Sequence, residues 1–421
     1  MKNSGIEWIG EIPDDWEVER LQWYIEEVKV SNNPMQTDCV LSLTNKAGVI
    51  PYEEKGAQGN VAKEDYTQYK LAYPHTIVAN SMNILIGSVG ICNYFGCVSP
   101  VYYVFKPTDK ADLFYINYIM QTVPFQKELR RYANGILEIR LRVSANGILK
   151  RKIAIPSLDQ QKSIVAEINK KCAAIDSMVA NQQAQIEKLK EYKQSVITEA
   201  VTKGLDPSVP MKPSGVEWIG EVPNSWQIIR GKNIFKQRNE KGNAKCLQLL
   251  SPTQHYGVIP QELYDQISGM TAVKLNLNVD LSTMKTIHNR DYCISLRSFQ
   301  GGFEYSTYEG VVSPAYQVFY AFVRINEKYY KYLFKEKGFI SEMNSFTLTI
   351  RDGKNISFGD FANSEIPYPP IDDQQQIADH LDKKCAEIDK LISVKQQKIE
   401  KLNEYKKSLI YEYVTGKKEV G

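Results

Sequence analysis

The sequence predicts a mixed α/β (α+β) protein in which two similar domains alternate with two long helices. Three observations predict this fold class. The chain has 421 residues, enough for two or more cores. It contains an internal repeat. Each copy of the repeat ends in about 45 residues with heptad periodicity. We therefore expect two globular domains at 1–155 and 206–368, each followed by a helical segment, at 156–205 and 369–421.

The repeat rests on two pairs of segments. Residues 1–20 return at 211–230 with twelve of twenty positions identical, and residues 170–202 match 383–415 at 19 of 33 positions. Agreement of this extent indicates a duplication. Between these segments the copies diverge, which has two interpretations. In the first, the divergence is neutral drift after the duplication. In the second, a shared scaffold carries two surfaces that are specialised for different targets.

Each domain is predicted to contain both strands and helices. Short apolar runs bounded by turn residues predict strands at 75–79, 101–105, 291–296 and 315–319. Longer stretches at 111–133 and 327–344 predict helices. The motif S-P-x-Y-x-V-F occurs once in each copy, beside one of these strands. These strands are therefore expected to belong to the shared scaffold.

The heptad segments predict a coiled coil. About 45 residues form roughly 65 Å of helix, more than a domain of this size can cover, so packing of each helix on its own domain alone is the weaker alternative. Because the chain must return from the second domain, we expect the two helices to pair antiparallel, with a pseudo-twofold axis between the copies. The predicted interface residues are Ile168, Cys172, Ile175, Val179, Ile186, Leu189, Leu381, Cys385, Ile388, Ile392, Ile399 and Leu402.

No catalytic or metal-binding motif is present in the sequence. The four histidines lack metal-ligand spacing, and H-E-x-x-H, G-x-S-x-G and P-loop patterns do not occur. The Gly87-Ser-Val-Gly90 loop lacks the dinucleotide-binding spacing. Triplets such as Glu53-x-Lys55 occur in nucleases but also arise by chance. We therefore expect no catalytic residues, no metal site and no cofactor in this chain.

Two loops of unequal length between alike strands suggest binding instead. They span 80–95 and 297–309, and the alternative is that both are ordinary polar surface loops. Polar side chains there suit the edges of bases, namely Asn80, Ser81, Asn83, Arg297, Ser298 and Gln300. Basic side chains later in each domain suit phosphates, namely Arg130, Arg131, Arg140, Arg142, Arg351 and Lys354. The net charge of +3 does not by itself indicate that the protein binds nucleic acid.

The cellular compartment is predicted from composition. No window of 18 uninterrupted apolar residues is present, and the first residues have no apolar core of a signal peptide. Seven cysteines without a C-x-x-C pair read as reduced thiols. We expect a cytoplasmic protein without a membrane span.

The arrangement resembles the specificity subunit of type I restriction–modification systems. The resemblance lies in the repeated S-G-[IV]-E-W-I-G-E-[IV]-P-x-x-W, the two helix openings I-P-x-[LI]-D-Q-Q and P-P-I-D-D-Q-Q-Q-I-A, and the helix ends I-E-K-L-x-E-Y-K-x-S-[VL]-I. It implies a non-catalytic chain whose two target recognition domains read a bipartite, asymmetric target in double-stranded DNA.

The same resemblance implies partners. The helices would set the separation of the domains and dock two modification (methyltransferase) subunits, which bring S-adenosylmethionine and methylate adenine. Restriction/translocase subunits, which use ATP and magnesium, would add DNA cleavage. Two rival functions are a coiled-coil scaffold that binds only proteins and a nuclease that acts alone.

Overall fold

The computed structural model describes residues 1–44, 48–55, 65–134, 141–242, 248–254, 256–268, 283–295, 302–346 and 356–420. It divides into two compact units. Unit 1 comprises Met1–Gln183 and Gln397–Gly421, and unit 2 comprises Ala184–Gln396. Each unit therefore contains one globular domain, the first part of one long helix and the last part of the other.

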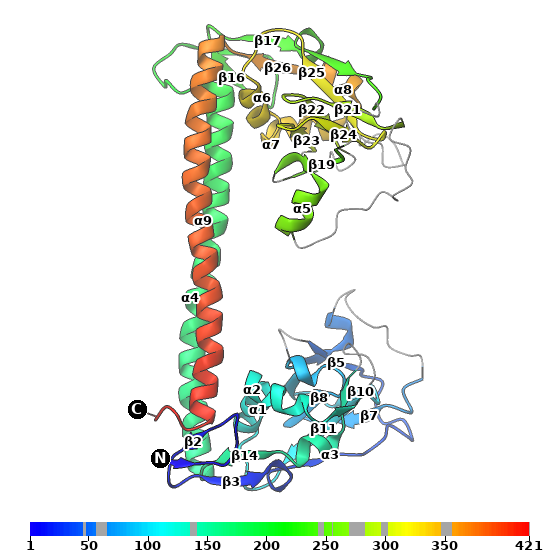
Figure 1. Ribbon diagram of the computed structural model, residues 1–421, viewed down its shortest axis with the longest axis vertical. Coiled ribbons are helices and arrows are strands. Elements are labelled where there is room, and N and C mark those ends of the chain that lie inside the picture. The colour runs from blue at the N-terminus through cyan, green and yellow to red at the C-terminus, as the bar shows by residue number, and fades with distance from the viewer. Residues whose placement is uncertain are drawn as a thin grey trace. The chain divides into compact units, whose positions relative to one another are not determined.

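Unit 1 is built on a four-stranded antiparallel sheet with the order β4-β11-β8-β9 (Figure 1). The S-P-x-Y-x-V-F motif leads into β11, which pairs with β8 from Tyr102↔Asn80 to Phe105↔Ile77. The strands are β1 Lys2–Asn3, β2 Glu11–Ile12, β3 Glu17–Arg20, β4 Ile25–Glu27, β5 Leu41–Thr44, β6 Gly48–Pro51, β7 Lys70–Ala72, β8 Thr76–Asn80, β9 Val89–Cys92, β10 Gly96–Val98, β11 Tyr102–Pro107, β12 Ala133–Asn134, β13 Arg142–Val143 and β14 Lys152–Ile155, and the short helices are α1 Leu113–Gln121, α2 Val123–Arg130 and α3 Ala145–Leu149.

Unit 2 repeats this architecture. Its four-stranded sheet has the order β18-β25-β22-β23, which matches the sheet of unit 1 strand by strand. The strands are β15 Met211–Pro213, β16 Glu221–Pro223, β17 Gln227–Arg230, β18 Phe235–Arg238, β19 Leu250–Thr253, β20 Gly257–Pro260, β21 Lys285–Ile287, β22 Tyr292–Ile294, β23 Phe303–Tyr305, β24 Gly310–Val312, β25 Gln317–Ala321 and β26 Glu365–Tyr368, and the short helices are α5 Gln261–Ser268, α6 Glu327–Leu333, α7 Lys337–Ser345 and α8 Phe358–Asn363.

Each predicted helical stretch in the domains consists of two helices. In unit 1, α1 ends before Thr122 and α2 carries a proline in its first turn, where the missing N–H costs no hydrogen bond. In unit 2, Glu336 separates α6 from α7, and its side chain accepts a hydrogen bond from the Phe339 N–H at 2.7 Å. The proline at the start of α2 and the capping carboxylate of Glu336 therefore mark helix boundaries that the apolar periodicity of the sequence does not reveal.

The domain cores differ in composition. The core of unit 1 is mainly aliphatic around the buried Tyr115 and Phe125. In unit 2 the ring of Phe235 lies 5.2–5.7 Å from the ring centroids of five other aromatic residues. Aromatic pairs at such distances add about 0.5–1.5 kcal/mol each beyond the burial of their area. The two copies therefore keep one topology with different packing.

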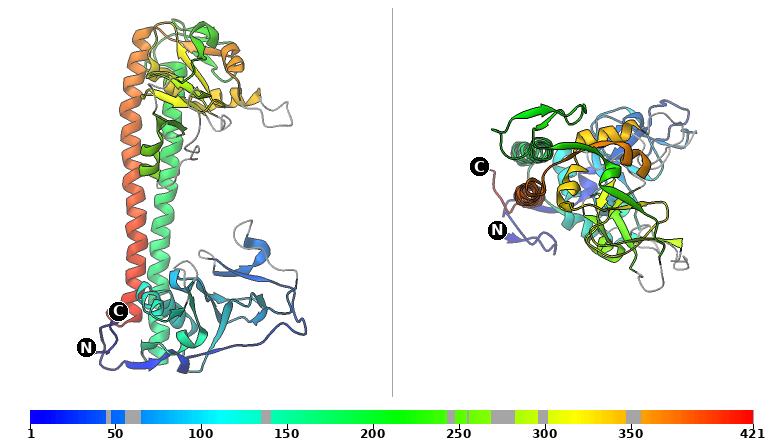
Figure 2. Two further views of the ribbon diagram at one scale, coloured as in Figure 1. Left: turned by 45° about the vertical axis from the view of Figure 1, so that its right-hand side comes forward. Right: turned by 90° about the horizontal axis from the view of Figure 1, so that it is seen from above.

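The long helices are α4 Leu158–Lys203 and α9 Ile371–Val414, and within each unit they lie side by side and antiparallel (Figures 1 and 2). In unit 1 Lys406 of α9 reaches both carboxylate oxygens of Asp176 on α4 at 2.7 Å. In unit 2 the equivalent lysine lies on α4 and the equivalent aspartate on α9, and the Lys193 ammonium lies 2.7 and 2.8 Å from the two Asp389 carboxylate oxygens. The fold class predicted from the sequence is confirmed, and all twelve predicted interface residues are buried or half-buried.

Each domain holds the start of the helix that follows it. Gln161 in the first turn of α4 is buried, accepts a hydrogen bond from the Asp112 N–H at 2.8 Å and donates one to the Pro156 carbonyl at 3.0 Å. The equivalent Gln374 in α9 accepts from the Asn326 N–H and donates to the Pro369 carbonyl, both at 2.8 Å. These glutamines fix the direction in which each helix leaves its domain.

Each domain also holds the end of the other repeat's helix. The Tyr115 hydroxyl donates to the Val414 carbonyl at 3.0 Å in unit 1, and the Tyr329 hydroxyl donates to the Val201 carbonyl at 2.8 Å in unit 2. The last residues of the chain consequently lie beside its first residues (Figure 2), where the Lys417 ammonium donates to the Ile9 carbonyl. Each unit is thus assembled from both repeats.

Among the described helices, none combines the length and low polarity that a bilayer span requires. The six cysteines within the described residues are free thiols.

Candidate functional site

The first predicted loop begins at the end of the central strand β8. Asn80 and Ser81 are buried, at 7% and 4% exposure. The Asn80 carboxamide oxygen accepts from the Met82 N–H at 3.0 Å, and the Ser81 carbonyl accepts from the Val143 N–H at 3.1 Å. These two residues close the end of the strand, whereas Asn83 is exposed. Their contact with bases stays a prediction, and Asn83 is the one whose side chain is accessible.

The structure brings Arg142 to this loop from sixty residues away in the sequence. Arg142 is exposed, it begins the two-residue strand β13, and its Nη2 lies 3.7 Å from the Met82 sulfur. Arg131 instead pairs with Glu7 at 2.8 Å and Glu128 at 3.2 Å, so its charge is already balanced on the surface. Arg130 is exposed at the end of α2. The other predicted DNA contacts lie outside the described residues, namely Arg140, Arg297, Ser298, Gln300, Arg351 and Lys354.

Both predicted loops contain a strand in the structure, β9 in 80–95 and β23 in 297–309, and β23 carries a buried charge pair. Glu304 in β23 is 2% exposed, and its Oε1 lies 2.6 Å from the Lys335 ammonium. Burial raises the pKa of the Glu304 carboxyl to about 7, because the loss of hydration outweighs the attraction of Lys335. Its Oε2 has no hydrogen-bond partner among the described residues. The pair therefore ties β23 to the α6–α7 turn at some electrostatic cost.

We predict that Glu304→Gln removes a pH dependence from the stability of the protein. A carboxyl whose pKa is raised from 4.5 to about 7 by folding adds stability below pH 4.5 that is lost as the pH rises through 7. The shift corresponds to about 3 kcal/mol in the free energy of unfolding between pH 5 and pH 8. Urea unfolding of both proteins at these two pH values measures it. An unchanged pH dependence in the variant contradicts the assignment.

A second charge cluster lies at the other end of this sheet. Arg238 makes a bidentate pair with the buried Asp291 at 2.7 and 3.0 Å, and its guanidinium lies over the Tyr320 ring. His288 lies 3.0 Å from both Glu240 and Glu309. The hydrogen bond from His288 lowers the pKa of Glu240. These contacts fix the loops around β18 and β22, and their carboxylates pair with Arg238 and His288.

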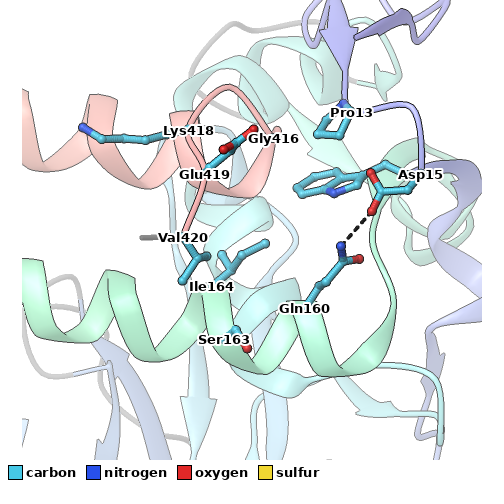
Figure 3. A pocket seen from close by; sticks show the side chains of 10 residues that line it. Pro13, Asp15, Gln160, Ser163, Ile164, Gly416, Lys418, Glu419 and Val420 are labelled. Carbon is cyan, nitrogen blue, oxygen red and sulfur yellow. Dashed lines mark hydrogen bonds between the residues drawn. The ribbon is translucent and has the colours of Figure 1, made fainter.

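A hollow of about 380 Å³ lies in unit 1 where the first residues, the start of α4 and the last residues meet (Figure 3). Asp15 and Gln160 point toward one another across it and are joined by a 2.7 Å hydrogen bond. The residue of unit 2 that corresponds to Gln160 is Asp373, which instead accepts from the Trp226 indole N–H at 2.8 Å. The remaining lining residues are Pro13, Trp16, Ser163, Ile164, Gly416, Lys418, Glu419 and Val420.

Four buried cysteine thiols of the described residues are not activated. Burial raises the pKa of the Cys97 thiol to about 11 and also raises that of Cys92, Cys172 and Cys385. A thiol in this state carries little thiolate at neutral pH. Within the described residues no three His, Cys, Asp or Glu side chains are grouped to hold a metal ion.

Sequence reasoning missed the polar contacts that assemble the units. A glutamine in the first turn of a helix is ordinarily solvated, so Gln161 and Gln374 gave no signal of burial beyond their recurrence at equivalent positions. Lys193 and Lys406 interrupt the apolar stripes in the sequence, but in the structure they make the interhelical ion pairs with Asp389 and Asp176.

The comparisons with known proteins agree with this architecture. Residues 223–404 match the family model of the type I restriction modification DNA specificity domain. The putative type I restriction enzyme MjaX specificity subunit of Methanocaldococcus jannaschii is 23% identical, and the match covers 97% of this chain and 95% of that protein. The chain is similar over nearly its whole length to type I restriction–modification specificity subunits. The resemblance seen in the sequence is thereby confirmed.

Other type I specificity subunits extend the similarity over the whole chain. The MjaVIII specificity subunit of the same organism is also 23% identical, with 96% of this chain and 93% of that protein covered. The crystal structure of an HsdS subunit from Thermoanaerobacter tengcongensis aligns with a TM-score of 0.53 at 12% identity, over 99% of this chain and 100% of that one. A chain from a study of complex assembly and conformational transition of the type I R-M system aligns with a TM-score of 0.68 at 11% identity, covering 96% and 98%. These two structures share their fold with this chain.

Proposed function

We propose that this chain is the sequence-specific DNA-binding subunit of a type I restriction–modification complex and reads a bipartite, asymmetric target. One observation carries the proposal. Units 1 and 2 have the same strand order and the same helix contacts, yet the two loops that follow the central strands β8 and β22 differ in length and in nearly every residue. A repeated frame with divergent loops is suited to reading two different sequences.

The charges of the described residues support DNA as the ligand. Arg142 is exposed beside the start of the first predicted loop, where a guanidinium can contact a phosphate or a guanine edge. Arg130 and Lys127 lie in the last turn of α2. In this proposal catalysis belongs to the partners, which supply S-adenosylmethionine, ATP and magnesium, and the whole complex acts in the cytoplasm.

Competition binding tests the function. The chain, assembled with its modification subunits, is titrated with duplexes that carry its mapped site or a scrambled one. The expected result is at least about 10³-fold preference for the site. The logarithm of affinity should fall linearly with the logarithm of salt concentration. Equal affinity for both duplexes refutes sequence-specific reading. Absence of binding supports the protein-only scaffold, and cleavage by the isolated chain with magnesium supports the self-sufficient nuclease.

The long helices support two equivalent docking sites for the modification subunits. Five large apolar side chains on them are about half exposed, namely Met178, Tyr192, Leu391, Val394 and Tyr405, and four of these form two equivalent pairs. In the repeat, Met178 corresponds to Leu391 and Tyr192 to Tyr405. Met178 and Tyr405 lie in unit 1, two residues and one residue from the Asp176–Lys406 ion pair. Tyr192 and Leu391 have the same places around the Lys193–Asp389 pair in unit 2.

We predict that Met178→Asp reduces the number of bound modification subunits from two to one. A charge in one apolar docking surface should weaken that site about tenfold or more, while the equivalent surface of unit 2 keeps its affinity. Adding Leu391→Asp should abolish both sites. Sedimentation of the purified mixture gives the mass of the complex. Ala173→Asp places the same charge at an exposed position elsewhere on α4 and should leave two subunits bound. Two bound subunits in the double variant contradict the assignment.

A further inference from the structure

A β-hairpin recurs in both units on the same frame. In unit 2, β19 and β20 pair from Leu250↔Pro260 to Thr253↔Gly257. In unit 1, β5 and β6 pair from Leu41↔Pro51 to Thr44↔Gly48. The threonine hydroxyl donates to the carbonyl of the glycine opposite it, at 2.9 Å in unit 2 and 3.1 Å in unit 1. Three residues separate threonine from glycine in each copy.

The hairpin packs against the strand inside each predicted reading loop, β23 in unit 2 and β9 in unit 1. Gly257 has a φ of +72°, and a Cβ there would lie 2.5 Å from the Tyr305 carbonyl oxygen of β23. In unit 1 a Cβ on Gly90 of β9 would lie 3.0 Å from the Leu43 side chain and 3.4 Å from the Gly48 Cα. At Gly257 both the positive φ and the close backbone contact require glycine, and at Gly90 a larger side chain would force its neighbours to shift. The place of the hairpin beside the loop is therefore part of the shared frame.

The tips of the two hairpins have no residue in common. The sequence between threonine and glycine is Asn-Lys-Ala in the first copy and Gln-His-Tyr in the second. In unit 2 the described tip residues Gln254 and Tyr256 are both exposed, Tyr256 at 52%. The Tyr256 N–H donates to the Thr253 hydroxyl at 3.0 Å, which fixes the backbone beneath the side chain. The same pair of strands is therefore joined by different residues in each copy.

We propose that Gln254 and Tyr256 are a second base-reading element of unit 2, in addition to the predicted loop. The carboxamide of Gln254 offers one donor and one acceptor, which match the N7 acceptor and N6 donor of adenine in the major groove. The aromatic face of Tyr256 offers an apolar contact for a thymine methyl group. This inference rests on the proposed function and names the residues and the base that this part of the site selects.

The test measures discrimination in the complete complex. Wild type, Gln254→Ala and Gln227→Ala are titrated with duplexes that carry every single-base change of the mapped site. Gln227 is an exposed glutamine on β17 and serves as the matched control. Gln254→Ala should lose about 5-fold to 100-fold discrimination at one A·T pair in the half-site of unit 2 and keep full discrimination elsewhere. Gln227→Ala should behave as wild type.

Two outcomes overturn the inference. Full discrimination at every position in Gln254→Ala removes the glutamine from the reading element, and equal weakening for all duplexes makes the tip a backbone clamp. Tyr256→Phe should keep discrimination at the neighbouring pair, whereas Tyr256→Ala should lose it; equal behaviour of the two variants overturns the tyrosine contact. If the wild-type complex shows no preference for its mapped site, the proposed function itself is refuted. Failure of this inference can therefore be distinguished from failure of the proposed function.

Discussion

Replacing residues 211–368 with residues 1–155 is expected to give a protein that reads its first half-site twice and no longer recognises the second. Affinity for the original target should fall by about 10³-fold or more, the usual difference between specific and non-specific DNA binding. The junctions fall in matching structure, because β3 pairs with β14 through Glu17↔Ile155 and β17 pairs with β26 through Gln227↔Tyr368. Sequencing of methylated sites in DNA exposed to the assembled complex measures the new target.

The replacement has one foreseeable defect in packing. Tyr413 is buried in unit 1 at the end of α9, and Ala200 is the corresponding residue at the end of α4. The transplanted domain would therefore meet a smaller side chain than in its own unit, and a buried void costs stability. Ala200→Tyr in the same hybrid should restore it. If the second half-site persists in a folded hybrid, the domains do not read independently.

Gln374→Leu is expected to lower the free energy of unfolding by about 2–4 kcal/mol, because it leaves two buried backbone groups without partners. The Asn326 N–H and the Pro369 carbonyl both bond to this side chain at 2.8 Å, and Gln374 is 1% exposed. Leucine has a similar volume but neither donates nor accepts. Urea or thermal unfolding of the purified chain measures the change.

The neighbouring Gln376 provides the control, since it is exposed two positions along the same helix. Gln376→Leu should change the free energy of unfolding by no more than about 0.5 kcal/mol. Equal effects of the two substitutions would show that the helix start tolerates loss of the contact. Gln161→Leu in unit 1 should lower the free energy of unfolding at least as much as Gln374→Leu, because Gln161 makes the two equivalent hydrogen bonds and also donates to the Lys110 carbonyl at 3.1 Å.

The duplication and the long helices could be predicted from the sequence, because the duplication leaves recurring segments and the helices leave a heptad spacing of apolar residues. Identical anchors revealed the repeat, and heptad spacing revealed which residues of α4 and α9 are covered. The antiparallel pairing followed from the path of the chain. Pairings between distant residues leave no such pattern, so the bond from Tyr115 to Val414 and that from Tyr329 to Val201 became visible only in the structure.

The candidate site was predicted less completely, because polarity in a sequence does not reveal burial. Asn80 and Ser81 have the chemistry of base readers but close the end of β8 inside the domain. Glu304 sits in an aromatic strand and is buried against Lys335. The β5–β6 and β19–β20 hairpins became candidates for reading DNA only through their place beside β9 and β23 in the structure.

The contacts of Tyr115 and Tyr329 carry an evolutionary consequence. Each domain grips the terminal turn of a helix encoded by the other half of the gene, as protomers do in a domain-swapped dimer. An ancestral chain of half this length, with one domain and one helix, could make every such grip with a second copy of itself. Gene duplication and fusion would then join the two protomers without requiring new contacts. Once they were joined, mutations could accumulate in one half alone, and a symmetric recogniser of inverted repeats became free to acquire an asymmetric target.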